Sequence, residues 1–218
     1  MSPPTTGRDW HAWHQQYADP TSSLSRRLEE VRIQLAALLE RGSGQVRLLS
    51  LCSGDGRDTI PVIAGAESQV AATLVELDEG LARTAATAAA SAGIAADVRA
   101  GDAGAAATWS DVLPVDVLML CGVFGNISDA DVDRTVGAVR SMLTPGGAVI
   151  WTRGRWVPED PTSHTDDPAE RVRRVFLAAG FDEVVFVKPA DASYRVGVAR
   201  LSEPSGDPPP QRLFSFVR

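Results

Sequence analysis

The sequence predicts an α/β protein, a three-layer sandwich in which a mostly parallel β-sheet lies between two layers of helices. Two observations predict this fold. Short apolar segments without helical periodicity alternate with helical segments five times before a strand-rich end. A glycine turn, Gly54-Asp55-Gly56, follows the first apolar segment, residues 46–51. Such a turn between a buried strand and a helix presents backbone N–H groups to a ligand, where the helix dipole favours negative charge.

Seven strands are expected. Six of them cover residues 46–51, 70–77, 95–100, 115–120, 148–152 and 184–187. We expect residues 212–217 to form the last strand. The sequence leaves open whether this segment or residues 194–201, which also alternate, pairs with the sixth strand.

The expected helices have clear start signals. The first covers residues 22–41, with Ser22 or Ser23 as its cap, and the last begins with Asp167 as N-cap and Pro168 at the first helical position. Three others lie between these two, at residues 58–66, 79–92 and 128–143.

The composition limits the function classes. The 218 residues are 44% hydrophobic with a net charge of −7, which suits one domain and disfavours a nucleic acid as substrate. Two cysteines make no disulfide framework, and no Cys/His cluster has metal-ligand spacing. The N-terminus lacks the apolar core of a signal peptide, and no apolar run approaches the ~20 residues of a membrane span. We therefore expect a soluble, cytoplasmic protein without a metal.

The glycine turn resembles motif I of class I S-adenosylmethionine (SAM) dependent methyltransferases, a strand followed by acidic-x-Gly-x-Gly-x-Gly. Gly54 and Gly56 match the motif, while Ser50 stands at its acidic position and Cys52 at its first glycine. A dinucleotide-binding loop is the rival interpretation, but its third glycine is missing. The resemblance implies a Rossmann-like, mostly parallel seven-stranded sheet with an antiparallel C-terminal strand.

Two further motifs follow the next strands. Glu76-Leu77-Asp78 ends the second strand, where a carboxylate accepts ribose hydroxyls in nucleotide-binding sheets. This stretch also resembles the family's second motif. After the third strand, Asp102-Ala103 resembles the family's Gly-Asp-Ala motif, in which the Asp accepts from the adenine amino group. The alternative for Asp102 is a helix N-cap, and the two roles are compatible.

The loop after the fourth strand completes the site that the resemblance implies. In the family's strand order the first and fourth strands are neighbours, so Cys52 and Cys121 would face each other, most simply as small buried thiols. SAM, and its product S-adenosylhomocysteine, would then contact Cys52, Ser53, Gly54, Asp55, Gly56, Glu76, Leu77, Asp78, Asp102, Ala103, Cys121, Gly122 and Val123.

The aromatic N-terminal segment looks like that of uncharacterised actinobacterial members of the family. The resemblance implies that Tyr17 and Arg27 meet the methionine carboxylate. His14 is the preferred candidate for a general base, if the acceptor has to lose a proton. We expect residues 1–41 to form a lid or cap on a single SAM-binding domain, residues 42–218.

These features predict methyl transfer from SAM to a small molecule. Arg153 and Arg155 are candidates for binding a substrate carboxylate, and Asn126 either satisfies loop backbone or touches substrate. A non-catalytic regulator is the alternative, motivated by the motif I departures. An aminopropyltransferase is a weaker one, because residues 121–127 include no acid. The sequence leaves open whether the chain forms a homodimer.

Overall fold

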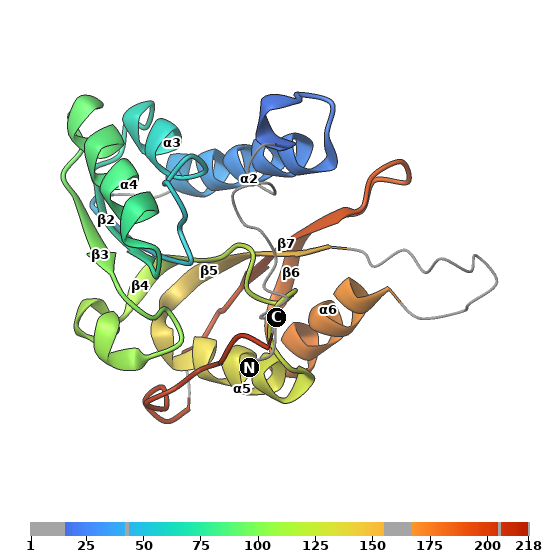
Figure 1. Ribbon diagram of the computed structural model, residues 1–218. Helices are drawn as coiled ribbons and strands as arrows, with labels where there is room; N and C mark the ends of the chain where they lie inside the picture. Colours follow the sequence, from blue (N-terminus) through green and yellow to red (C-terminus); the bar gives the residue numbers. More distant parts are fainter. Residues whose placement is uncertain (1–15, 42–43, 155–166, 205, 218) are drawn as a thin grey trace, which may run out of the picture.

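The computed structural model describes residues 16–41, 44–154, 167–204 and 206–217. Its centre is a seven-stranded sheet in the order β3-β2-β1-β4-β5-β7-β6 (Figure 1). All strands are parallel except β7, which is antiparallel to both of its neighbours. The strands are β1 (Val46–Leu51), β2 (Val70–Glu76), β3 (Ala96–Ala100), β4 (Val115–Leu120), β5 (Leu143–Gly154), β6 (Asp182–Val187) and β7 (Tyr194–Arg200). The predicted sandwich and sheet are confirmed.

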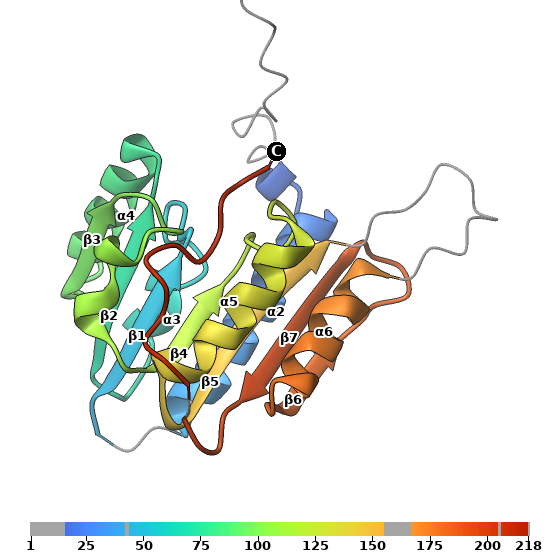
Figure 2. The same ribbon diagram turned by 90° about the horizontal axis from the view of Figure 1, so that it is seen from below.

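Two layers of helices cover the sheet (Figure 2). One face carries α2 (Ser23–Glu40), α3 (Ile60–Ala64) and α4 (Glu79–Ser91), and the other carries α5 (Asp129–Met142) and α6 (Pro168–Ala178). Ser22, one of two predicted caps, accepts a hydrogen bond from the Ser25 N–H at 3.1 Å. Because both faces of the central strands are covered, those strands are apolar almost throughout, as buried parallel strands are.

The strand order reverses between β1 and β4. From β1 the chain moves outward to β2 and β3, then returns to the other side of β1 to begin β4. Ligands of open α/β sheets bind outside the carboxyl ends of the strands at such a switch point. The fold therefore places the glycine turn after β1, and the loop after β4, on the two sides of the switch point, where the ligand crevice of such sheets forms.

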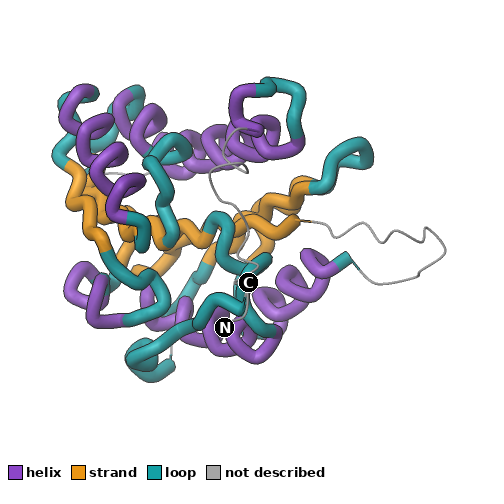
Figure 3. The backbone as a smooth tube through the Cα atoms, in the orientation of Figure 1, coloured by secondary structure: helices purple, strands orange, loops and turns teal. Residues whose placement is uncertain are grey.

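The prediction that residues 212–217 form the last strand is wrong. β5 already pairs with β4 and β7, and β7 in turn pairs with β6, so the alternating segment at Tyr194–Arg200 is the seventh strand. Residues 211–217, the C-terminal strap, instead run as a loop over the face that α5 covers (Figures 2 and 3). Leu213 and Phe214 of the strap are completely buried in that layer of the core.

The strap fills a gap in the helix layer. Between β3 and β4 the chain forms only two single-turn 3-10 helices, η2 (Ala106–Thr108) and η3 (Ser110–Val112), in place of a full covering helix. Strap residues make isolated bridges to both flanks of this gap, at Ala105 and at Ile127. Burial of Leu213 and Phe214 thus replaces apolar contacts that a crossover helix would otherwise supply.

Candidate functional site

The glycine turn after β1 has the backbone that its sequence predicts. Gly54 and Gly56 have φ values of 58° and 73°, in the left-handed region that glycine reaches without cost. A Cβ on Gly56 would lie 2.5 Å from Ile60 Cδ1, so a side chain at this position would also have to displace the buried Ile60 side chain. The turn is fixed to the neighbouring strand because the Ser53 N–H donates to the Val75 carbonyl at 3.0 Å.

Cys52, which stands where the family's motif has glycine, is also in the left-handed region, with φ 63°. It is the one non-glycine residue with positive φ among those that the structure describes. A side chain there costs about 1–2 kcal/mol, because Cβ approaches the following carbonyl oxygen.

We therefore expect Cys52→Gly to be more stable than Cys52→Ala, although glycine removes one more methyl group. Both variants lose the thiol, so the difference between them reports the strain of the left-handed backbone conformation at residue 52. Glycine's larger unfolded-state entropy offsets part of the relief, leaving an expected difference of about 0.5–1 kcal/mol in the free energy of unfolding. Urea denaturation of the two variants measures it. Greater stability of the alanine variant would contradict backbone strain at residue 52.

Glu76, at the end of β2, links the turn to the neighbouring strand end. One carboxylate oxygen accepts from the Gly54 N–H at 2.8 Å, and the other accepts from the Asp78 N–H at 3.0 Å. Asp78 caps α4 through Leu81, which accounts for its position after the strand. The side chain of Leu77 is 63% exposed, which presents an apolar surface beside this carboxylate.

Asp102, after β3, is not a helix N-cap: η2 begins at Ala106 with Ala105 as its N-cap, and the Asp102 carboxylate holds a local turn instead. Its Oδ1 accepts from the Gly104 N–H at 2.8 Å, and its Oδ2 pairs with Arg212 of the strap at 2.9 Å. The carboxylate stays partly exposed at the ligand edge. The Ala103 carbonyl accepts from the indole of Trp109, which is completely buried in the core.

The loop after β4 is held by its own polar side chains. The Asn126 side chain donates to the Gly122 carbonyl at 2.7 Å, so of the two predicted roles the structure has the backbone one. The Gly122 N–H donates to the buried hydroxyl of Thr152 on β5 at 2.9 Å. Val123 is completely buried, which corrects its prediction as a ligand contact: its side chain faces the core.

The two cysteines lie beside each other, as predicted. β1 and β4 pair as far as Ser50 and Met119. Cys52 and Cys121 each follow directly after one of these strands and are close enough to interact electrostatically. Burial raises the pKa of both thiols well above its ordinary value. Both are therefore protonated at neutral pH and are poor nucleophiles, although each cysteine is partly exposed and not fully buried as predicted.

Tyr17 and Arg27, predicted from the N-terminal segment, lie together next to Arg57, which follows the glycine turn. An Arg27 Nη donates to the Tyr17 hydroxyl at 3.1 Å, joining η1 (Gln16–Ala18) to α2. The Arg57 guanidinium lies 4.2 Å from the centre of the Tyr17 ring and pairs with Asp55. Burial raises the pKa of the Tyr17 hydroxyl, which therefore stays protonated and can donate.

Sequence reasoning missed Arg57 and Asp58, which complete this cluster. Arg57 is held from α2 by Arg32, whose guanidinium donates to the Arg57 carbonyl at 2.7 and 3.0 Å. Asp58 accepts from the Thr59 hydroxyl at 2.9 Å and interacts electrostatically with Arg27. Their position just after the last glycine of the turn was the available signal, since residues there enter the switch-point crevice.

Asp58 makes stability depend on pH. Burial raises its pKa, more than the Thr59 hydrogen bond and Arg27 lower it. The Asp58 carboxyl group therefore holds its proton more tightly in the folded protein than in the unfolded chain. Stability falls as the pH rises through the pKa that Asp58 has in the folded protein. We expect Asp58→Asn to increase the free energy of unfolding at pH 7, with a gain that shrinks toward pH 4.

Denaturation with urea between pH 4 and 8 measures this gain. Asp191→Asn is the control of opposite sign, because pairing with Arg26 lowers the pKa of Asp191, so its loss should cost stability at neutral pH. A gain for Asp58→Asn that does not change with pH would show that burial of the charge is not its cause.

The substrate candidates are only partly within the described residues. Arg153 extends from the end of β5 over the loop after β4, where its Nη1 would lie 3.2 Å from a Cβ on Gly125. His14 and Arg155, predicted as general base and substrate ligand, lie outside the described residues.

The residues around the crevice fit an adenosyl ligand with a charged amino-acid end. The Ser53 hydroxyl is buried without a hydrogen-bond partner among the described residues, so a polar group next to the turn is still to be satisfied. The Glu76 carboxylate keeps lone pairs for hydroxyl groups, and Leu77 offers an apolar face to a base. Tyr17 and Arg27 add donors for a carboxylate.

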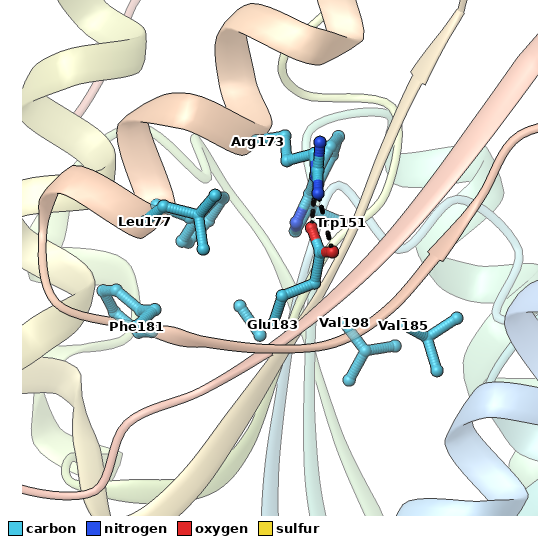
Figure 4. A pocket seen from close by; sticks show the side chains of 9 residues that line it. Trp151, Arg173, Leu177, Phe181, Glu183, Val185 and Val198 are labelled. Carbon is cyan, nitrogen blue, oxygen red and sulfur yellow. Dashed lines mark hydrogen bonds and ion pairs between the residues drawn. The ribbon is translucent and has the colours of Figure 1, made fainter.

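A separate small hollow lies between α6 and strands β5–β7 (Figure 4). Trp151 forms part of its lining and stacks on Phe176 at 5.8 Å, and Gly197 gives the indole room. The polar side chains lining it, Arg173 and Glu183, are paired with each other. This hollow is distant from the switch point, and we assign no chemistry to it.

Two classes of site are absent from the part of the chain that the structure describes. It contains no cluster of three or more His, Cys, Asp or Glu side chains able to hold a metal ion. None of its helices combines the length and the apolar character needed to cross a membrane.

Comparison with known proteins gives matches of structure alone. No family model and no curated protein matches the chain. The SAM-dependent methyltransferase of Thiobacillus denitrificans, solved in complex with S-adenosyl-L-homocysteine, matches with a TM-score of 0.55 and 23% sequence identity, over 72% of this chain and 66% of that one. This chain has the fold of SAM-dependent methyltransferases.

Other proteins with the methyltransferase fold differ in what they bind or do. An O-methyltransferase family 2 protein from Planctomyces limnophilus, in complex with apigenin, matches with a TM-score of 0.60 and 20% identity, over 82% of this chain and 60% of that one. The cyclase SpnF matches with a TM-score of 0.57 and 19% identity, over 81% of this chain and 82% of that one. The methyltransferase fold thus does not by itself determine the reaction.

Proposed function

We propose that this protein binds SAM and transfers its methyl group to a small-molecule acceptor. The observation that carries the proposal is the position of Glu76, whose carboxylate is hydrogen-bonded to the glycine turn at the switch point and can accept further hydrogen bonds there. A carboxylate at that place in a nucleotide-binding sheet accepts ribose hydroxyls.

Each part of the cofactor has a candidate partner. Glu76 binds the ribose, Leu77 covers one face of the adenine, and Asp102 accepts from the adenine amino group. The protonated Tyr17 hydroxyl and the Arg27 guanidinium hold the methionine carboxylate. The unpartnered hydroxyl of Ser53 hydrogen-bonds to the same end of the ligand.

The chain's role in the transfer is chiefly to bind and align. Bound SAM supplies an electrophilic methyl group, and displacement at that carbon requires the acceptor to approach in line. Asn126 and Thr152 hydrogen-bond to the backbone of Gly122 in the loop after β4, and this loop forms the wall against which the acceptor lies. Arg153 at its outer side favours an acceptor with an anionic group. The protein's net charge of −7 disfavours a nucleic acid.

Transfer of labelled methyl groups tests this proposal. The protein is incubated with methyl-labelled SAM and pools of small acceptors, separated into anionic, neutral and cationic fractions. We expect label in the anionic fraction, and loss of that transfer in Glu76→Ala. Binding of SAM without transfer to any fraction would favour the second candidate, a SAM-fold protein without methyl transfer, which the departures at Ser50 and Cys52 motivate.

A further inference from the structure

The C-terminal strap connects the two loops that flank the nucleoside end of the proposed cofactor site. On one side, Leu213 N–H donates to the Gly104 carbonyl at 2.8 Å, and Ala106 N–H donates to the Gln211 carbonyl at 2.9 Å. On the other side, Val217 N–H donates to the Asn126 carbonyl at 2.8 Å. The strap is therefore bonded to the loop after β3 and to the loop after β4.

The strap approaches the loop after β3 so closely that only glycine fits there. A Cβ on Gly104 would lie 2.2 Å from the Phe214 carbonyl oxygen, which is a backbone atom and cannot move aside alone. Phe214 is completely buried, so the strap cannot shift outward without exposing its ring. This fit fixes the place from which the neighbouring Arg212 side chain starts.

Arg212 delivers one guanidinium nitrogen to Asp102. Its Nη1 lies 2.9 Å from Asp102 Oδ2 and also donates to the Phe214 carbonyl at 3.2 Å, so the strap holds the guanidinium in place. The other oxygen, Oδ1, accepts from the Gly104 N–H at 2.8 Å. The Asp102 backbone is also fixed, because its carbonyl accepts from the Thr108 hydroxyl at 3.1 Å.

We propose that Arg212 is a positioning residue for the cofactor: it fixes the rotation of the Asp102 carboxylate so that the lone pairs left over face the nucleobase. An ionised carboxylate has about four acceptor sites, of which Gly104 and Arg212 use two. Without Arg212 the half-exposed carboxylate would be held on one oxygen only. This inference rests on the proposed function.

The chemistry predicts a preference among purines as well as an affinity. A carboxylate that only accepts hydrogen bonds favours a 6-amino group, which donates, over a 6-oxo group, which does not. Positioning by Arg212 should therefore strengthen the binding of S-adenosylhomocysteine and have little effect on the binding of its 6-oxo analogue, S-inosylhomocysteine. General loosening of the strap would weaken the binding of both ligands alike.

Calorimetric titration of both ligands tests the assignment. For Arg212→Ala we expect roughly 5-fold weaker binding of S-adenosylhomocysteine and unchanged binding of S-inosylhomocysteine, with most of the loss restored in Arg212→Lys. Asp102→Ala combined with Arg212→Ala should bind no more weakly than Asp102→Ala alone. Arg47→Ala is the matched control, expected to have no effect. It breaks the Arg47–Asp116 pair at the amino-terminal ends of β1 and β4, away from the proposed cofactor site.

Three results would overturn the inference. Unchanged binding of S-adenosylhomocysteine by Arg212→Ala, or equal losses for the two ligands, would do so while leaving the proposed cofactor in place. Failure of the unaltered protein to bind S-adenosylhomocysteine would instead remove the proposed function, and this inference with it.

Discussion

Asp167→Ala is expected to lower the free energy of unfolding by about 3–5 kcal/mol, the cost of leaving a buried charge without its partner. Arg195 is only 2% exposed, and its Nε pairs with Asp167 Oδ2 at 2.9 Å. Its remaining contacts are to backbone carbonyls, which do not neutralise a cation. Asp167 also caps α6 by accepting from the Ala169 N–H at 3.0 Å.

Two comparison variants separate these roles. Asp167→Asn keeps an acceptor for the helix cap and loses the charge. We therefore expect it to recover only the smaller part of the unfolding free energy that Asp167→Ala loses. Asp191→Ala breaks the exposed pair with Arg26 in the same region, and its effect should be much smaller. Urea denaturation gives all three values. A loss in Asp167→Ala no larger than that in Asp191→Ala would contradict a buried ion pair.

Glu76→Ala is expected to weaken SAM binding by about 1–3 kcal/mol, or roughly 5- to 150-fold, as is typical when a charged hydrogen-bond partner is lost. In the proposed site this carboxylate accepts the ribose hydroxyls. It also accepts from the Gly54 and Asp78 N–H groups, so its removal leaves the glycine turn less firmly held. We expect the fold to persist, because the turn is independently bonded to Val75.

Calorimetric titration with SAM measures the loss, and thermal unfolding verifies that the variants are folded. Glu76→Gln keeps one acceptor oxygen and should lose less affinity than Glu76→Ala. Glu79→Ala, three residues along the chain, removes an exposed carboxylate that pairs with Arg83, and should bind SAM normally. Normal affinity in a folded Glu76→Ala variant would remove Glu76 from the cofactor site.

The parts of the fold that depend on local sequence were predictable. The glycine turn follows from residues next to each other, since Gly54 and Gly56 allow the φ values that the turn needs. The strand-end positions of Glu76 and Asp102 follow from the apolar segments before them. Because parallel strands bring their carboxyl ends to one edge, these local patterns were sufficient to bring the proposed cofactor residues together.

The parts that depend on long-range packing were not predictable in the same way. Residues 194–201 and 212–217 both alternate, but only residues 194–200 pair with β5 and β6 in the structure. The strap fills a gap in the helix layer, because the connection between β3 and β4 forms no full helix there. No pattern within residues 212–217 reveals this packing. Arg57 was missed for a similar reason: its partner ring, Tyr17, is 40 residues away in the chain.

The most direct test of the account is calorimetric titration of the unaltered protein with SAM and with S-adenosylhomocysteine. The arrangement of Glu76, the glycine turn and the Tyr17–Arg27 pair predicts micromolar binding of both ligands at one site per chain. A folded sample, free of carried-over ligand, that binds neither compound would contradict the proposed cofactor. The fold would then serve another function.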